Sequence, residues 1–379
     1  MDAYDGRAIL FVDGTQSMAG FTEGEAFREF DIVLDAVATG LGLTQVVMFG
    51  VTEAPPPAGG LFRIRPAGRG LHDENAYIGL NNPDYCLFDL ARTSSDPRPI
   101  LYLTDGVQSA RSLGTPGPSV AVLQELIRTG HTVSVMAFRG GFAGRAWSEQ
   151  ASAWIPGVSV PDRPFYLIWV TRDQADSDFL FSMLSRASLG HVAFARFGGA
   201  SPSCRLFPLI DRQSEQEDPL WILLPPSVAR RIDSEHLPVA EWRCALPPST
   251  ALEFVAASVA STFRAWEPGS EGFSPPTEAP VGTEFSSDSI HAEGTSSSVV
   301  VKGTVGTLTS SRYAYIALGL TATPGPLRED LRSLSTNSDV SPDEVSRTYR
   351  FAWLLDHLIQ ADFAREVPRE QIGLTIQYR

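Results

Sequence analysis

The chain has 379 residues and a formal net charge of −14, from 30 basic and 44 acidic residues. At about 100–200 residues per domain, this length predicts two domains. Both halves carry the same negative charge, so we expect neither a nucleic-acid binder nor a protein of anionic membrane surfaces. Of the 30 basic residues only Lys302 is a lysine, which leaves the first half of the chain without a lysine for catalysis.

Targeting signals and cysteines point to the interior of the cell. A signal peptide begins with basic residues, whereas residues 1–5 are acidic. No apolar run reaches the ~18 residues of a membrane helix. Cys86, Cys204 and Cys244 are widely spaced and form neither a CxxC motif nor an even disulfide framework. We therefore predict a soluble, cytoplasmic protein with free thiols.

The first half alternates strand-like and helix-like segments. Apolar runs predict strands at 7–12, 45–50, 61–65, 99–104, 131–138 and 165–170. Helical spacing and capping residues predict helices at 25–38, 83–92, 118–129 and 175–186. Because such alternation is typical of parallel strands with helices on both faces, we predict for 1–188 an α/β domain with a doubly wound, mostly parallel sheet. Residues 139–164 are interpreted as an insertion before the last strand.

The second half has a different pattern, with short alternating runs between Ser-, Gly- and Pro-rich segments. These runs lie at 191–197, 220–224, 252–266, 298–305, 313–322 and 372–378. They predict that 189–379 is a β-rich, sandwich-like domain. A helix is predicted near 342–362, with Ser341 as its N-cap and Glu344 completing a capping box. We expect its apolar face to dock on its own domain rather than on a partner.

Two acidic motifs follow buried strands of the first half. Asp13, Thr15 and Ser17 come directly after the first strand, and Asp105 follows another within Leu103-Thr104-Asp105-Gly106. Ligands of open α/β sheets gather at the carboxyl ends of the strands, so these motifs are predicted to meet at one edge. Carboxylate and hydroxyl oxygens suit a hard divalent cation, Mg²⁺ or else Mn²⁺ or Ca²⁺.

Together the motifs resemble the von Willebrand factor A (vWA) family and its metal-ion-dependent adhesion site. That family has DxSxS on the first loop, a Thr on a middle loop and an Asp in a T-D-G turn. Asp13, Thr15 and Ser17 match the first element and Asp105 the last, whereas no Thr lies between residues 71 and 92. By position Asn82 replaces the middle Thr, with Asn81 as the second choice, and its carbonyl oxygen could ligate the ion or hold a water. The resemblance covers residues 5–188.

The resemblance implies binding rather than catalysis. Family members leave one coordination position of the metal open, and an acidic residue of a protein partner fills it. It implies an adaptor or scaffold in an intracellular bacterial complex, of the kind found beside AAA+ ATPases and in defence or conflict systems. We therefore predict a metal-dependent protein-interaction module and no enzyme.

Other classes fit the residues less well. A haloacid-dehalogenase-like phosphatase needs a second Asp where Thr15 stands, a P-loop enzyme needs a Gly-Lys pair, and a GxSxG elbow needs Gly at the same position as Thr15. Two alternatives stay open. The first is a structural assembly subunit with a vestigial metal site, and the second is a metal-dependent hydrolase that uses Asp13 and Asp105.

Overall fold

The structure, a computed structural model, describes part of the chain. The described residues are 8–22, 27–43, 45–49, 62–66, 77–79, 84–93, 98–106, 117–187, 190–199, 203–208, 219–224, 228–233, 240–246, 250–266, 284–287, 290–291, 297–304, 313–364 and 372–377. The chain divides into two compact units, and it passes between them five times. The first unit comprises Met1–Ala200, Ser249–Glu253 and Leu327–Asp362. The second comprises Ser201–Pro248, Phe254–Pro326 and Phe363–Arg379.

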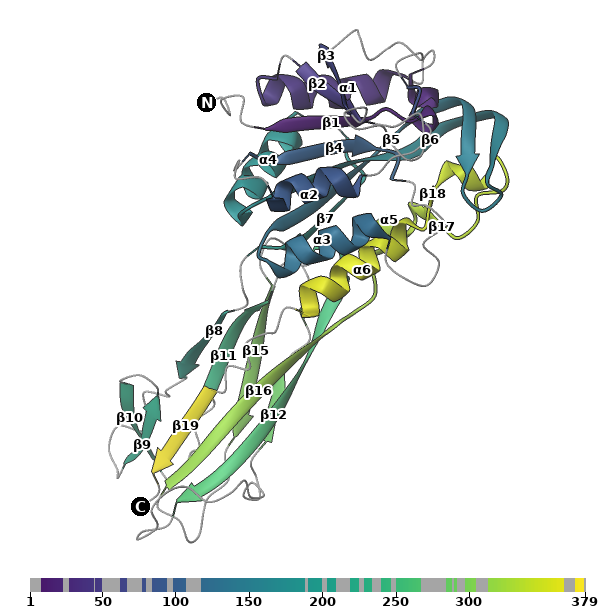
Figure 1. The fold of residues 1–379 in the computed structure, drawn as a ribbon. Coiled ribbons are helices and arrows are strands. Elements are labelled where there is room, and N and C mark those ends of the chain that lie inside the picture. Colours follow the sequence, from purple (N-terminus) through teal and green to yellow (C-terminus); the bar gives the residue numbers. More distant parts are fainter. Residues whose placement is uncertain are drawn as a thin grey trace. The chain divides into compact units, whose positions relative to one another are not determined.

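The first unit is of the α/β class, with a mixed sheet in the order β3-β2-β1-β4-β6-β5-β7 (Figure 1). Its strands are β1 (Ile9–Asp13), β2 (Gln45–Phe49), β3 (Phe62–Pro66), β4 (Ile100–Thr104), β5 (Thr132–Ser148), β6 (Ala153–Thr171) and β7 (Ala193–Gly198). Within these described strands, β1 pairs in parallel with β2 and β4, and the remaining neighbours are antiparallel. The prediction of a mostly parallel sheet is therefore wrong, although the predicted strands all occur.

The largest departure from the prediction lies at 139–164, which is not a loop insertion. These residues are the outer arms of the long β5–β6 hairpin, and they pair from Arg139 and Pro164 out to Ser148 and Ala153. Register shifts after Gly140 and Gly144 interrupt the ladder. Such bulges bend a strand, which allows two strands of this length to leave the plane of the sheet.

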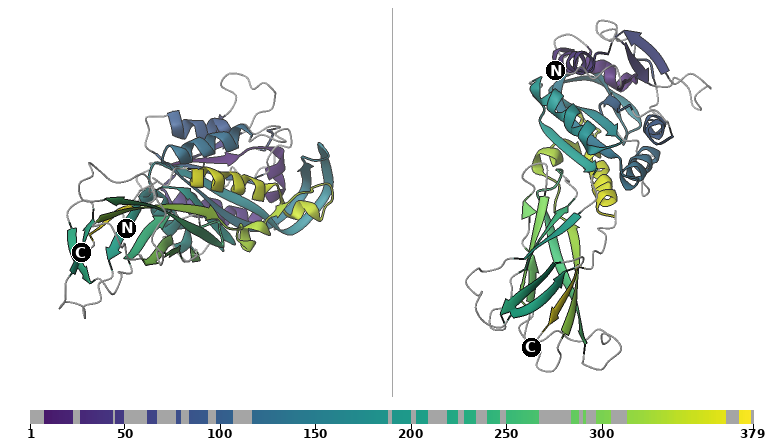
Figure 2. Two further views of the ribbon diagram at one scale, coloured as in Figure 1. Left: turned by 90° about the horizontal axis from the view of Figure 1, so that it is seen from below. Right: turned by 90° about the vertical axis from the view of Figure 1, so that its left-hand side faces the viewer.

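Helices cover both faces of this sheet (Figure 2). They are α1 (Phe27–Gly40), α2 (Tyr85–Thr93), α3 (Pro118–Arg128) and α4 (Gln174–Arg186), close to the predicted helices. On one face, buried residues of α1 and α4 form a single core with Leu10 and Val12 of β1. On the other face, Phe88 of α2 packs edge-on against Tyr102 of β4, with ring centroids 6.1 Å apart. The alternation of side chains along each strand produces these two cores.

The first unit also contains a segment from far along the chain. Leu327–Asp362 returns to it, and β7 completes its sheet. This segment includes α5 (Glu329–Arg332), β17 (Ser335–Thr336), the 3₁₀ helix η7 (Glu344–Ser346), β18 (Thr348–Tyr349) and α6 (Phe351–Ala364). The division thus differs from the predicted boundary at 188, because the predicted domain 189–379 includes strand 191–197 and helix 342–362.

The predicted helix near 342–362 is not continuous, because η7, β18 and α6 follow one another in this stretch. The bonds of the capping box form, since the Ser341 N–H donates to the Glu344 carboxylate at 3.0 Å and the Glu344 N–H donates to the Ser341 hydroxyl at 3.4 Å, but only the short helix η7 follows, with Asp343 as its N-cap. Arg350 then adopts a left-handed conformation, with φ of 58°, and α6 begins at the next residue. The helix packs on the first unit, where Phe351 is buried and stacks on Tyr166 at 4.1 Å.

The second unit is β-rich and built from two antiparallel sheets, in the orders β10-β9-β19-β16-β12-β14 and β13-β15-β11-β8. Its strands are β8 (Ser203–Pro208), β9 (Pro219–Leu224), β10 (Val228–Asp233), β11 (Ala240–Leu246), β12 (Phe254–Trp266), β13 (Glu284–Ser287), β14 (Ile290–His291), β15 (Ser297–Thr304), β16 (Tyr313–Pro324) and β19 (Ile372–Gln377). The longest ladder joins β12 to β16. The sandwich-like packing of the two sheets stays a prediction.

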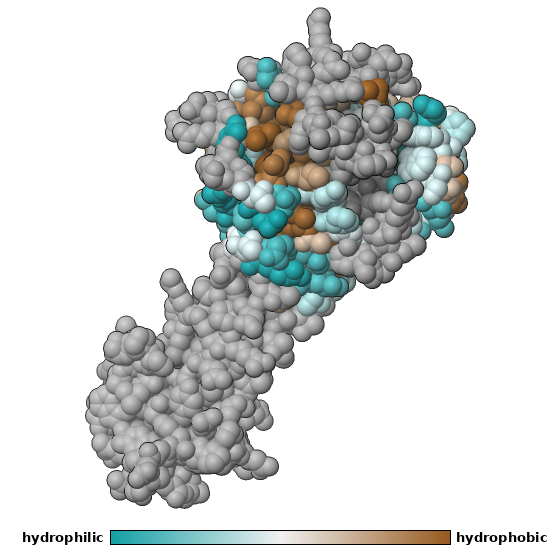
Figure 3. Space-filling model, viewed as in Figure 1, coloured by the Kyte–Doolittle hydropathy of each residue, from teal (hydrophilic) through white to brown (hydrophobic). Residues whose placement is uncertain are grey.

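The surface of the first unit is mixed. In the space-filling view, hydrophilic residues and apolar residues lie side by side on the coloured part of this unit (Figure 3). The exposed large apolar side chains are dispersed over several elements, namely Ile32, Ile78, Tyr85, Leu90, Phe179, Val192 and Val340. Single exposed apolar residues are normal on folded proteins. Within the part of the chain that the structure describes, no helix is long and apolar enough to cross a membrane.

Candidate functional site

The first motif forms a tight turn at the carboxyl end of β1. Asp13 is buried, and one of its carboxylate oxygens accepts hydrogen bonds from the backbone N–H of Thr15 at 3.0 Å and from the Thr15 hydroxyl at 2.7 Å. The Thr15 hydroxyl also lies 3.0 Å from the hydroxyl of Ser17. Ser17 is the second residue of the 3₁₀ helix η1 (Gln16–Phe21). The three side chains of this motif therefore bring their oxygens together, as predicted from their spacing.

The second motif reaches the same point from β4. The Thr104 hydroxyl donates to the other carboxylate oxygen of Asp13 at 2.8 Å, and it accepts from the N–H of Gly106 at 3.1 Å. Asp105 is buried between them, with 2% of its surface exposed. Gly106 has a φ of +69°, and a Cβ there would lie 2.6 Å from the ring of Tyr166. The turn after Asp105 therefore needs glycine.

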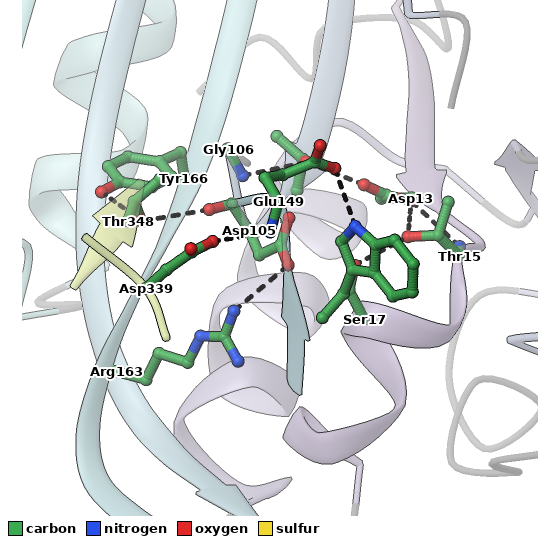
Figure 4. A network of polar contacts seen from close by, with 12 residues as sticks. Asp13, Thr15, Ser17, Asp105, Gly106, Glu149, Arg163, Tyr166, Asp339 and Thr348 are labelled. Atoms are coloured by element: carbon green, nitrogen blue, oxygen red, sulfur yellow. Dashed lines mark hydrogen bonds and ion pairs between the residues drawn. The ribbon is translucent and has the colours of Figure 1, made fainter. Parts of the chain in front are cut away.

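The two carboxylates lie close enough for their charges to interact (Figure 4). The pKa of Asp13 is raised to about 7, first by burial and then by the negative charge of Asp105. The hydrogen bonds from Thr15 and Thr104 lower the pKa but do not offset these effects. A buried pair of like charges of this kind is stabilised by a proton or by a cation.

A cation is already present beside Asp105. The guanidinium of Arg163 is buried, with 3% of its side chain exposed, and its Nη2 lies 3.5 Å from a carboxylate oxygen of Asp105. Its carbon lies 4.1 Å from the ring centroid of Phe142 and 5.8 Å from that of Phe21, a cation–π arrangement. Burial lowers the pKa of Arg163, whereas the charges of Asp105 and Asp339 raise it.

The antiparallel insertion of β6 brings Arg163 to this edge. Thr104, the last residue of β4, pairs with Tyr166 of β6. Because β6 runs in the opposite direction, the residues that precede Tyr166 extend beyond the end of β4, next to the turn that holds Asp105. A parallel strand in this position would begin at the opposite edge of the sheet, and Arg163 would then lie at that opposite edge.

The segment Leu327–Asp362 supports this edge of the sheet. The Thr348 hydroxyl donates to the backbone carbonyl of Asp105 at 3.2 Å, and the Tyr166 hydroxyl donates to Thr348 at 2.9 Å. Burial raises the pKa of the Tyr166 hydroxyl, which stays protonated and keeps donating. The Asp105 turn is thus fixed by β6 and β18 together.

Asp339 in the same segment holds the tip of the β5–β6 hairpin. Its buried carboxylate accepts hydrogen bonds from the Ser148 hydroxyl at 2.9 Å and from the N–H groups of Glu149 and Gln150 at 2.7 Å and 3.2 Å. This clamp fixes the hairpin arm from which Arg163 projects.

The middle loop approaches the first motif through its backbone. The N–H of Gly79 donates to the carbonyl of Gly14 at 2.9 Å, and Gly79 accepts from the N–H of Gln16 at the same distance. Tyr77 is buried nearby, and its pKa is raised by burial and by the charge of Asp13. Asn82, the predicted ligand of this loop, lies outside the described residues.

Another acidic residue lies at the start of α2. Asp84 is partly buried and accepts a hydrogen bond from the Ser119 hydroxyl at the start of α3. Burial raises the pKa of Asp84 to about 6, although its hydrogen bonds lower it. It is not among the charges that shift the pKa of Asp13.

The donor set fits a hard divalent cation. Asp13 and Asp105 supply carboxylate oxygens, and Thr15 and Ser17 supply hydroxyl oxygens, which are ligands that Mg²⁺ accepts. Among the residues that the structure describes, no three His, Cys, Asp or Glu side chains form a metal-binding group. The candidate site has two carboxylates among the described residues, and its other candidate ligands are hydroxyl oxygens.

Several residues of the site carry no motif in the sequence. They are Arg163, Tyr166, Asp339 and Thr348, which reach it through contacts between segments that are far apart in the chain. Thr104, in contrast, belongs to the motif that contains Asp105. Compared with known proteins, the chain matches no family model, and no curated protein and no solved structure is significantly similar to it.

Proposed function

We propose that the chain is a divalent-cation-dependent protein-interaction module of the vWA type. Asp13, Thr15, Ser17 and Asp105 would hold the ion, Mg²⁺ or else Mn²⁺ or Ca²⁺, with Asn82 as a variable ligand. The observation that carries the proposal is the burial of Asp13 beside Asp105, at one sheet edge and among hydroxyl groups. A site that gathers two negative charges in this way gains stability from a cation.

The strand arrangement adds support to the family resemblance. In the order β3-β2-β1-β4, the neighbours β1 and β4 are parallel, so the two motifs that follow them lie at one edge of the sheet. The departure begins at β6, which lies between β4 and β5. The proposal therefore rests on the β1 and β4 loops and not on the whole sheet.

The bound ion would supply an open coordination position that attracts a carboxylate. The chain's own residues orient the ligands: Thr104 fixes one oxygen of Asp13, and Thr348 fixes the backbone at Asp105. Among the described candidate ligands Ser17 is partly exposed, whereas the other three are buried. A partner's acidic side chain would therefore approach from the Ser17 side.

Thermal unfolding of the full chain with EDTA, Mg²⁺ or Mn²⁺ tests the ion site. Ligand binding to the folded state adds about 2.7 kcal/mol at a hundredfold excess over Kd, so the midpoint should rise with metal concentration. D13N should abolish this rise. D89N is the matched control, because Asp89 lies on α2 in an exposed pair with Arg92. A metal response that persists in D13N would refute the site.

Fluoroacetate serves as a probe for the open position. Its ¹⁹F resonance should broaden in the presence of the wild-type chain and Mg²⁺. It should stay sharp with EDTA and with D13N. Equal broadening in all samples would show that carboxylates bind elsewhere, which contradicts the proposed mode of recognition.

A second candidate is the structural assembly subunit with a metal-free site. The ion pair of Arg163 with Asp105 favours it, because the guanidinium already neutralises one carboxylate. A truncation that removes 190–379 would not test this candidate. It would also remove β7 and Leu327–Asp362, which belong to the first unit. The thermal experiment does: an unchanged midpoint with Mg²⁺ and Mn²⁺ in the wild-type chain would favour it. The metal-dependent hydrolase stays a minor alternative that a phosphatase assay with both ions tests.

A further inference from the structure

Arg163 has an unusual place for a buried arginine. Its charge is opposed by Asp105, which is itself a proposed metal ligand, and the two side chains are each 3% exposed. The aromatic rings of Phe142 and Phe21 lie against the guanidinium, and they provide no carboxylate or carbonyl oxygen. Figure 4 shows Asp105 between Arg163 and Asp13. Arg163 and a metal ion would therefore act on the same carboxylate.

The pairing of Arg163 is incomplete. Strong arginine–carboxylate pairs have two parallel hydrogen bonds of about 2.7–2.9 Å. Here the closest contact is 3.5 Å, and Nε and Nη1 have no hydrogen-bond partner among the described residues, although both are buried. The ion pair therefore offsets only part of the cost of burying the guanidinium. An arrangement of this kind favours exchange of the carboxylate between two cations.

The packing around Arg163 is rigid. Gly20 of η1 has no room for a side chain, because a Cβ there would lie 2.4 Å from the ring of Phe142. Asp339 fixes the hairpin tip, and Phe165, two residues after Arg163, packs against Phe21 at 5.5 Å. The guanidinium is therefore held at the site by the fold and cannot leave it as a surface arginine can.

We propose that Arg163 is a tethered counter-ion of the metal site, which holds Asp105 when no divalent ion is bound and competes with that ion for the carboxylate. This inference rests on the proposed function. It assigns to Arg163 a positioning role and a role in setting metal affinity. The apo protein keeps Asp105 in place without metal, and the ion binds more weakly than to the same ligands without the arginine.

The test compares the affinity of the full chain for Mg²⁺ and Mn²⁺ by isothermal titration calorimetry. R163Q removes the charge and keeps a polar side chain, and it should bind both ions at least tenfold more tightly than the wild-type chain. R139Q is the matched control, because Arg139 lies on the same hairpin in a partly exposed pair with Asp162. Its affinity should equal that of the wild-type chain. R163K keeps the charge and should stay within about threefold of wild type.

The outcomes separate this inference from the proposed function. Equal or weaker binding by R163Q, with clear binding by the wild-type chain, overturns the competition and leaves the metal site standing. Binding by R163Q alone supports the competition, with a guanidinium strong enough to exclude the ion. Absence of binding in both chains overturns the proposed function and the competition together.

A second measurement keeps the inference testable if R163Q does not fold. The Nε–H resonance of Arg163 can be assigned in the wild-type chain by its absence from R163K. Addition of Mg²⁺ should shift this resonance in step with metal saturation, because Asp105 then turns to the ion. An Arg163 resonance that stays in place at saturating Mg²⁺, while other resonances move, overturns the inference.

Discussion

Asp13 and Asp339 are two buried carboxylates of the same unit with opposite electrostatic neighbours. Each accepts hydrogen bonds from both hydroxyl and backbone N–H groups. The charge nearby differs, since Asp13 faces Asp105, whereas Asp339 attracts the guanidinium of Arg163. Hydrogen bonds alone therefore do not decide whether a buried carboxylate stabilises this fold. The comparison predicts that the Asp339 carboxylate stabilises the fold, whereas the Asp13 carboxylate destabilises it unless a proton or a cation is bound.

The largest effect should come from breaking the clamp. D339A leaves the buried Ser148 hydroxyl and two part-buried N–H groups of the hairpin turn without their acceptor, at about 1–3 kcal/mol for the buried hydroxyl and less for each N–H group. We expect a loss of about 3 kcal/mol or more in the free energy of unfolding, measured with urea. D343A, an exposed change in the same segment, should stay within about 0.5 kcal/mol. Equal stability of the two variants would contradict the clamp.

A substitution of Asp13 should increase the free energy of unfolding rather than reduce it. In EDTA at pH 8, D13N removes one of two repelling charges, so the free energy of unfolding should increase by about 1 kcal/mol or more. D105N should instead reduce it, because it leaves the buried Arg163 without its carboxylate. The urea unfolding midpoints of D13N and D105N measure these two effects. A loss of stability in D13N comparable to that of D339A would remove the difference between the two carboxylates.

The pH dependence of stability follows from the same raised pKa. With a folded-state pKa of about 7 and an unfolded value of 3.8, Asp13 binds a proton more tightly in the folded state. Stability without metal should therefore rise as the pH falls from 8 to 6.5, by at most about 1.4 kcal/mol per unit.

D13N should show a flatter curve over this range. D84N should keep the rise, because the pKa of Asp84 is about 6 and this group titrates mainly below the range. Thermal midpoints in EDTA measure all three curves, and identical slopes for the wild-type chain and D13N would contradict the assignment.

The smallest effect is expected at Thr104. T104V removes a donor to Asp13, and because that hydrogen bond lowers the pKa, the pKa should rise further. The cost should be on the order of 1 kcal/mol at pH 8, and the midpoint of the pH–stability curve should move upward. T93V is the control, since its hydroxyl bonds an exposed carbonyl of α2. An unmoved midpoint would show that Thr104 does not hold Asp13.

The sequence predicts the strands and helices of the first unit well, but not the direction of β6. The run 165–170 is continuously apolar, and a buried strand has this pattern whether its neighbours are parallel or antiparallel. Pro156, Pro161 and Pro164 favour a loop before it, because proline is rare inside strands. In the structure these residues lie within β6, whose ladder with β5 has register shifts.

The residues of the candidate site likewise fall into those that the sequence predicts and those that it does not. Asp13, Thr15, Ser17 and Asp105 were predictable, since each lies in a short motif directly after an apolar strand. Arg163 was not, because its position depends on the antiparallel register of β4 and β6. Thr348 was likewise hidden, since nothing local to it indicates that its segment returns to the first unit. Motifs thus reveal the candidate ligands, while long-range contacts determine which residues surround them.

The late return of Leu327–Asp362 has a consequence for synthesis on the ribosome. The contacts of Thr348 with Asp105 and of Phe351 with Tyr166 cannot form until the intervening 201–326 have been made. At about 5–20 residues per second, the nascent first unit waits on the order of ten seconds with its sheet edge uncovered. Until then a growing chain displays the Asp105 turn without the support of Thr348. Only a chain translated past this segment presents the finished turn.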